Sequence, residues 1–194
     1  MLDNKEIENI KKNMKLFISD GSIVLNKPGK FASFFLNNAS NSLNSAKLLF
    51  EASVNKQLQE KIGFIDFNGL LWVVNASYYS MFYAARALLE NEGVKIKTDS
   101  ASVHLITFDA LVYYFYLTGK IERNIIEEFK EAGEEAFEFL GKEKANSLIE
   151  DYSYEKEKRS RFTYEMGEIV MQNKAETSLK RANKFVDEIK KLIK

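Results

Sequence analysis

Arg159, Arg161 and Tyr164 form the closest grouping of residues in this sequence that can hold a phosphate and stack on a base. A guanidinium presents a planar fork of N–H donors that matches phosphate oxygens, and a tyrosine ring offers a stacking surface. On a helix, positions 161 and 164 share a face, whereas position 159 is offset. The same pattern also suits ion pairs with nearby glutamates or a contact between two subunits. We treat the three residues as a candidate nucleotide or RNA site.

Three further candidates lie in apolar surroundings. His104 is the only histidine of the chain. Near a helix start it can bond a ligand phosphate, or it is a structural residue whose nitrogens are satisfied by its neighbours. Tyr79 stands between Tyr78 and Tyr83, and these rings are either core aromatics with bonded hydroxyls or a stacking platform. Arg86 is expected to pair with a buried carboxylate or an interface group, because a lone buried charge is costly.

Composition excludes several other chemistries. The formal net charge is zero, so no global positive field attracts nucleic acid, and any such contact needs a local patch. With no cysteine and one histidine, the chain has neither disulfides nor the ligand set of a cysteine–zinc or di-iron site. The sequence also lacks a Gly-x-Ser-x-Gly elbow and a glycine-rich phosphate loop. We therefore expect no metal and no cofactor.

The elements that must position these residues are helices. There is one proline, Pro28, and strand-type alternation is almost absent, so long helices are allowed nearly everywhere. We predict an all-α, up-and-down bundle of four to five long antiparallel helices over 28–194, preceded by an appendage at 1–27 that holds a short helix and an extended segment. Helices are expected at 3–18, 30–54, 67–91, 101–118, 122 to about 140, 143–171 and 173–193.

For three of these helices the sequence also predicts where they end or which face they bury. Asn173, with Glu176 three residues later, resembles a capping box that starts the last helix, and Gly141 is expected to kink or end the helix before it. The third helix should bury one stripe: Val103, Ile106, Ala110, Tyr113 and Leu117. The fourth helix has an acidic face, which we interpret as solvated: Glu127, Glu128, Glu131, Glu134, Glu135 and Glu138.

The most apolar segment, 69–89, is predicted to be a buried helix of a soluble protein. It contains Asn75 and Arg86, and an arginine at the centre of a membrane span costs about 2.5–3.5 kcal/mol. The first residues lack the basic start and apolar run of a signal peptide. We therefore expect a cytoplasmic protein without a membrane partner.

Three segments in this order resemble the archaeal and bacterial branch of the HEPN family (higher eukaryotes and prokaryotes nucleotide-binding domain). Residues 79–89, Tyr-Ser-Met-Phe-Tyr-Ala-Ala-Arg-Ala-Leu-Leu, are similar to the family's second helix. Residues 104–121 resemble its third helix, which starts at a histidine and ends in Gly-Lys-Ile. Residues 159–164 and the Ala-Asn-Lys-Phe-Val stretch at 182–186 resemble its last region, with Thr163 where the family has an aspartate.

The resemblance implies a four- or five-helix bundle, commonly a homodimer, that binds nucleotides or RNA. Many HEPN proteins are metal-independent ribonucleases that act as toxins beside a small nucleotidyltransferase antitoxin. Their signature is an arginine followed, after four to six residues, by a histidine. The resemblance therefore implies a prokaryotic toxin–antitoxin setting, with a nucleotidyltransferase as a possible partner protein.

This chain lacks the signature histidine. Counted from Arg159, its positions hold Tyr164, Glu165 and Met166, and counted from Arg161 they hold Met166, Gly167 and Glu168. An unaided tyrosine titrates near 10 and is a poor base at neutral pH. We predict a dimeric nucleotide- or RNA-binding module rather than an enzyme. The alternatives are a metal-independent RNase toxin with an atypical Arg/Tyr/Glu site and a non-catalytic structural dimer.

Overall fold

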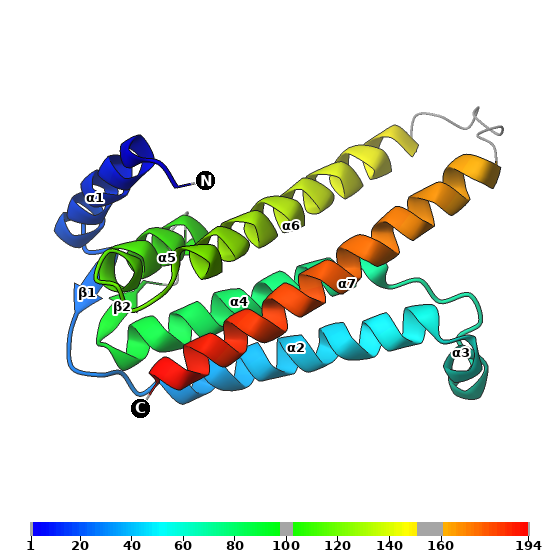
Figure 1. Ribbon diagram of the computed structural model, residues 1–194, viewed down its shortest axis with the longest axis horizontal. Helices are drawn as coiled ribbons and strands as arrows, with labels where there is room; N and C mark the ends of the chain where they lie inside the picture. Colours follow the sequence, from blue (N-terminus) through cyan, green and yellow to red (C-terminus); the bar gives the residue numbers. More distant parts are fainter. Residues whose placement is uncertain (1, 98–102, 151–160, 194) are drawn as a thin grey trace.

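Four long helices form the frame of the molecule, as the sequence predicts. The computed structural model describes residues 2–97, 103–150 and 161–193. Helices α2 (Ala32–Val54), α4 (Leu70–Asn91), α6 (Arg123–Glu150) and α7 (Arg161–Leu192) alternate in direction along the long axis (Figure 1). The fold is therefore an all-α, up-and-down bundle, and the predicted fold class is confirmed.

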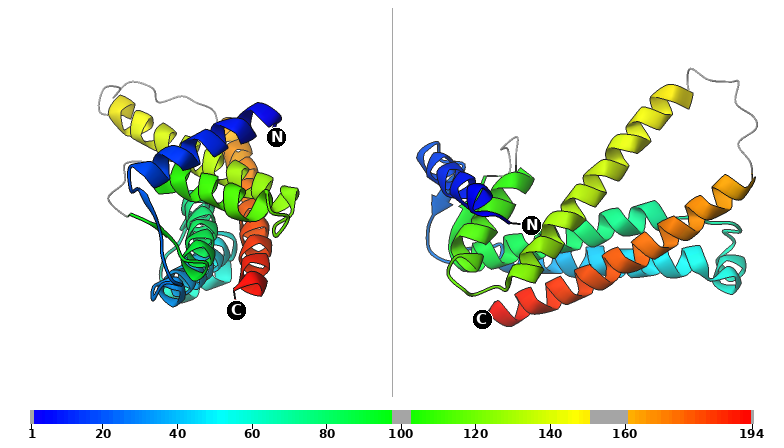
Figure 2. Two further views of the ribbon diagram at one scale, coloured as in Figure 1. Left: turned by 90° about the vertical axis from the view of Figure 1, so that its left-hand side faces the viewer. Right: turned by 45° about the horizontal axis from the view of Figure 1, so that its top comes forward.

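Helix α4 lies at the centre because almost every face of it is apolar. Sixteen of its 22 residues are buried, and it packs most extensively against α2 and α7. Helix α2 contributes a narrower stripe, in which Ala39, Leu43 and Ala46 are buried. Towards its C-terminal end, α6 inclines away from the layer formed by α2, α4 and α7 (Figure 2).

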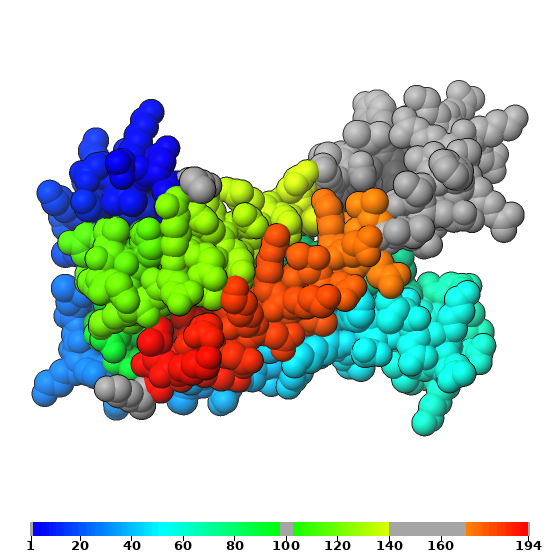
Figure 3. Space-filling model, in the orientation of Figure 1, coloured from blue at the N-terminus to red at the C-terminus, as the bar shows by residue number. Residues whose placement is uncertain are grey.

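The N-terminal segment packs on this frame. Helix α1 (Asn4–Ser19) is capped by the Asp3 carboxylate, which accepts from the Glu6 N–H, and it buries Ile10 and Met14. It lies against α5 (Val103–Leu111) at one end of the molecule (Figure 3). Strand β1 (Ile23–Leu25) pairs antiparallel with β2 (Val94–Ile96), which follows α4. The two segments therefore hold the chain start against the end of α4.

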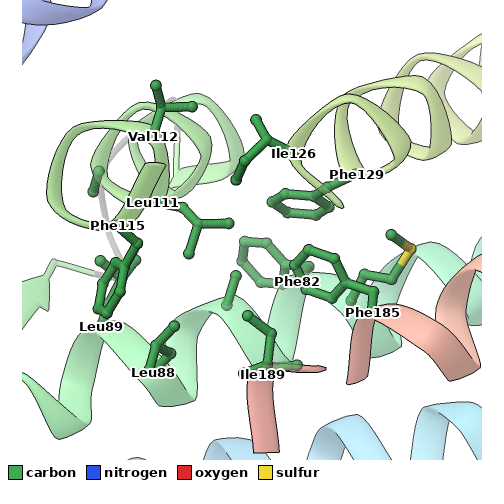
Figure 4. Packing of buried hydrophobic residues seen from close by; sticks show 14 of the residues in the cluster. Phe82, Leu88, Leu89, Leu111, Val112, Phe115, Ile126, Phe129, Phe185 and Ile189 are labelled. Atoms are coloured by element: carbon green, nitrogen blue, oxygen red, sulfur yellow. The ribbon is translucent and has the colours of Figure 1, made fainter. Parts of the chain in front are cut away.

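The main core joins α4, α5, α6 and α7. Figure 4 shows aromatic and aliphatic side chains from these helices converging on one another, among them Phe82, Leu111, Phe129 and Phe185. Phe129 and Phe185 lie with ring centroids 5.0 Å apart, which fixes α6 against α7. A smaller cluster around Val73 and Val74 joins α4 to α2 and α7.

The acidic face of α6 is only partly solvated, which corrects the interpretation given above. Arg181 of α7 contacts the carboxylates of Glu131 and Glu135, at 3.0 and 3.1 Å, and Lys184 contacts Glu128 at 2.7 Å. The glutamates repeat at helical spacing, so several of them face the basic residues of α7. Glu134 remains exposed.

The predicted core stripe of the third helix is wrong beyond Ala110. Residues Val112–Tyr116 form a π-helical segment, η1, and the Leu117 N–H donates to the Val112 carbonyl five residues earlier. This hydrogen bond spans one residue more than the bond of an α-helix, and the following side chains are therefore rotated around the helix axis. Phe115 is consequently buried, whereas Tyr113 and Leu117 are more than a third exposed.

The expected breaks near the C-terminus are also wrong. Helix α6 continues through Gly141 to Glu150, and α7 runs without interruption through Asn173. Asn173 therefore lies inside the helix, where its carbonyl accepts from the Thr177 hydroxyl. The sequence analysis also missed α3 (Lys56–Ile62), although Asn55 and Gly63 mark its two ends as caps. No helix among the described residues has the length and apolarity to cross a membrane.

Candidate functional site

His104 sits in an aromatic cluster beside the central helix. Its Nδ1 lies 2.8 Å from the Tyr78 hydroxyl oxygen, and its ring centroid is 4.3 Å from that of Phe82 and 5.8 Å from that of Tyr79. Burial and the nearby Arg86 charge lower the pKa of His104 below 6.5, so the imidazole is neutral at pH 7. Burial likewise raises the pKa of Tyr78, which keeps its phenolic proton. These contacts favour the structural interpretation of His104 over a phosphate ligand.

A cavity of about 520 Å³ borders this cluster, and His104 and Tyr78 form part of its lining. Its walls are mostly apolar and come from α1, α4, α5 and α6, with Tyr78, Phe108 and Phe129 among them. Gly133 of α6 makes room for the Tyr78 ring, since a Cβ there would lie 3.2 Å from Cε2 of that ring. We call this space the α1 cavity.

Asp109 is the buried acid of the α1 cavity. It is 2% exposed, and its Oδ2 accepts from the Asn13 amide of α1 at 2.9 Å. Burial raises the pKa of Asp109 to about 6, with the Asn13 bond opposing the shift and Glu6 adding to it. At the rim, Lys130 contacts Glu6 at 2.6 Å, which connects α6 to α1.

A second concavity follows the seam between α2 and α4. It holds about 660 Å³ and is lined on the α4 side by Trp72, Ala76, Tyr79 and Tyr83. These positions are spaced by four, three and four residues, so they share one face of the helix. The α2 side contributes a matching row of small polar residues: Asn38, Asn41, Ser42 and Ser45. We call it the α2–α4 groove.

The α2–α4 groove combines exposed aromatic rings with neutral hydrogen-bonding groups. Trp72 is 52% exposed, and Tyr79 and Tyr83 are partly exposed. None of the described residues that line the groove is charged. Flat rings flanked by amides and hydroxyls can stack on a base and bond its edge.

Arg86 lies beyond one end of this aromatic row. Its Nη2 donates to the Ile96 carbonyl at 3.1 Å, and its guanidinium carbon lies 4.7 Å from the centroid of the Phe35 ring. Phe35 in turn stacks on Tyr83, with the centroids 6.4 Å apart. Burial lowers the pKa of Arg86, and the Glu90 charge opposes this shift. Among the described residues, Arg86 thus bonds a backbone carbonyl and lies over an aromatic face, instead of pairing with the carboxylate that the sequence analysis offered as its partner.

The structure joins some of the predicted site residues and leaves others aside. Tyr79 contacts His104, and Arg86 lies on the same helix two turns further on. Arg159 lies outside the described residues. Arg161 and Tyr164 belong to the first turn of α7, but their side chains are outside the described part of the chain. The predicted grouping of these three residues therefore stays a prediction.

Sequence reasoning named His104 and Tyr79, which line the two concavities, but it missed other members of both. Asp109 could have been noticed in the sequence, because it is the one acidic residue of the mostly apolar stretch Val103–Leu111. Trp72 could also have been noticed, since the only tryptophan of the chain falls on a stripe with Tyr79 and Tyr83. Asn13 and Asn38 could not have been found from the sequence, because an asparagine on a helix is usually solvated.

The chain matches no protein-family model, no curated protein and no solved structure. The resemblance to the HEPN family therefore rests on the residues quoted for it. Among the described residues, no three histidine, aspartate or glutamate side chains gather closely enough to hold a metal ion.

Proposed function

We propose that this chain is a HEPN-like nucleotide- or RNA-binding module whose α2–α4 groove takes the bases of a single strand. The observation that carries the proposal is the row Trp72, Tyr79 and Tyr83. It lines a groove of about 660 Å³ whose described lining residues are uncharged. Stacking of a base on an aromatic side chain contributes about 1–3 kcal/mol per base and tolerates any sequence. The amides of Asn38 and Asn41 supply donors and acceptors for the base edges.

In this proposal the phosphates are held outside the groove, because the part of its lining that the structure describes carries no cation. The N-terminal end of α7, which begins at Arg161, lies at the same end of the bundle as the N-terminal end of α4, which carries Trp72 (Figure 1). A strand that follows the groove towards this end approaches the arginine-bearing segment. Arg159 and Arg161 are the proposed phosphate contacts, and Tyr164 is a further stacking residue.

The proposal includes a homodimer and a nucleotidyltransferase partner, and both rest on the resemblance alone. The lack of a histidine after either arginine favours binding over cleavage, because general acid–base catalysis needs a group that titrates near neutral pH.

The proposal is tested by fluorescence anisotropy with a labelled single-stranded RNA of about ten nucleotides, which is within the usual size of such sites. We expect saturable binding, and Tyr79→Ala should weaken it about tenfold through the loss of one stacking contact. Phe137→Ala is the matched control: this ring is half-exposed, lies in the α1 cavity and should not affect RNA binding.

Two outcomes contradict the proposal. Equal losses for Tyr79→Ala and Phe137→Ala would place RNA outside the α2–α4 groove. Cleavage of the RNA in the presence of EDTA, followed on a gel, would favour the metal-independent RNase.

A further inference from the structure

The α1 cavity has the walls of a small-molecule site. Its volume of about 520 Å³ falls within the range of ligand pockets, about 300–1,000 Å³. Its aromatic rings come from three different helices: Tyr78 from α4, Phe108 from α5, and Phe129 and Phe137 from α6. Phe137 is half-exposed, so one wall is open to an entering molecule.

The charges around the α1 cavity are unbalanced towards the negative. Among the described residues that line it, Glu6, Asp109 and Glu134 are acidic, and Lys130 supplies the one ammonium. That ammonium is already engaged by Glu6 at 2.6 Å. His104 is neutral at pH 7 because its pKa is lowered, and Tyr78 keeps its proton. An anion entering this cavity would be repelled by this excess of carboxylates, whereas a cation would be attracted.

Asp109 is placed to anchor such a cation. Its carboxylate is 2% exposed and lines the cavity, and one oxygen is held by the Asn13 amide at 2.9 Å. A buried carboxylate gains more from a directly bonded cation than an exposed one, because little water competes for it. The faces of the surrounding rings add attraction for a positive charge.

We propose that the α1 cavity is a binding site for a small organic ammonium ion that carries an aromatic or aliphatic body. The ammonium bonds Asp109, and the apolar body packs against Phe108, Phe129 and Phe137. Nucleotides are excluded, since their phosphates would lie among the carboxylates of Glu6, Asp109 and Glu134. The site is therefore separate from the α2–α4 groove, and either proposal can fail without the other.

Binding at this site depends on pH. Burial raises the pKa of Asp109 to about 6, so the anchoring carboxylate is lost as the pH falls below that value. The other titratable groups that face it are Glu6 from α1, His104 from α5, Tyr78 from α4, and Lys130 and Glu134 from α6. Protonation of His104 in acid adds a positive charge that repels an ammonium, so this contribution lowers affinity in the same direction.

The test is isothermal titration calorimetry of the full chain at pH 7.5 with three probes of one shape. Benzylamine is a cation, benzyl alcohol is neutral and benzoate is an anion. We expect benzylamine to bind at least about tenfold more tightly than benzyl alcohol, a difference of about 1.4 kcal/mol, and benzoate not to bind. Benzylamine affinity should fall below pH 6.

Asp109→Asn keeps the shape of the side chain and removes its charge, so benzylamine and benzyl alcohol should bind this variant equally. Asp187→Asn, at an exposed position on α7, is the matched control and should preserve the preference. The proposal is overturned if benzyl alcohol binds the unaltered protein as tightly as benzylamine. It is also overturned if the preference survives in Asp109→Asn, or if benzylamine shows no binding at concentrations up to about 10 mM, which corresponds to a binding free energy of about −2.7 kcal/mol.

Discussion

A single carboxyl group shows how one residue can serve a site at the expense of the fold. Asp109 lies on the inner face of α5, where apolar side chains would pack without cost, and its one polar contact among the described residues is the Asn13 amide at 2.9 Å. A buried ionised acid with so little support destabilises the folded state. Functional positions often carry such a cost, because activity and stability favour different residues.

Asp109→Asn is therefore expected to stabilise the protein at neutral pH. The pKa of Asp109 is raised from 3.8 to about 6 in the folded state, so folding favours the protonated form. Its stabilising contribution is complete below pH 3.8 and is lost as the pH rises through 6. At pH 7.5 the substitution should raise the free energy of unfolding by about 1–3 kcal/mol, and the gain should shrink towards pH 4.

Urea denaturation at both pH values measures this effect, with Asp187→Asn as the exposed control. A less stable Asp109→Asn protein at pH 7.5 would contradict the assignment of Asp109 as an uncompensated buried acid.

Turns of the chain place the elements that build both concavities. Gly93 ends α4 with a φ of 79°, and its carbonyl accepts from the Asn26 N–H at 2.9 Å, next to the β1–β2 pair. A Cβ at this position would lie 2.0 Å from the Asn26 carbonyl oxygen. Gly119, after η1, has a similar φ of 74° but no heavy atom within 4 Å of a built Cβ.

The two glycines form a matched pair for a prediction. Gly119→Ala should cost only the backbone strain of a positive φ, about 1 kcal/mol. Gly93→Ala adds a collision with backbone that cannot move without disturbing the strand pair, so we expect about 3 kcal/mol or more. Chemical denaturation compares the two. Equal losses in the free energy of unfolding would mean that the close approach of Gly93 to Asn26 does not constrain the fold.

The sequence could predict the long helices but not their irregularities. The apolar positions of 67–91 cover the whole helix surface, and this pattern alone places α4 at the centre. The π-helical segment at Val112–Tyr116 depends on tertiary packing, and a run of four aromatic residues, Tyr113 to Tyr116, gives no period from which to infer it. Asn173 misled because a local capping pattern is weaker than the packing that keeps α7 continuous.

At the scale of the molecule, one central helix serves two surfaces. Tyr78 faces the α1 cavity, whereas Tyr79 and Tyr83 face the α2–α4 groove, so a single run of aromatic residues is divided between them. The sequence left open whether these rings are core aromatics or a stacking platform. It could not indicate which ring faces which space, because that depends on how α2 and α5 pack around α4. Neither Asn13 nor Asn38 could be assigned before their helices were placed.

The central claim, that bases stack in the α2–α4 groove, is tested most directly by the fluorescence of Trp72. This is the only tryptophan of the chain, it is 52% exposed, and it lines the groove. Titration with a short single-stranded RNA should quench its emission in a saturable manner, because a stacked base contacts the indole ring. The midpoint should match that of anisotropy and shift in Tyr79→Ala. RNA binding that leaves Trp72 emission unchanged, or no binding at all, would contradict the claim.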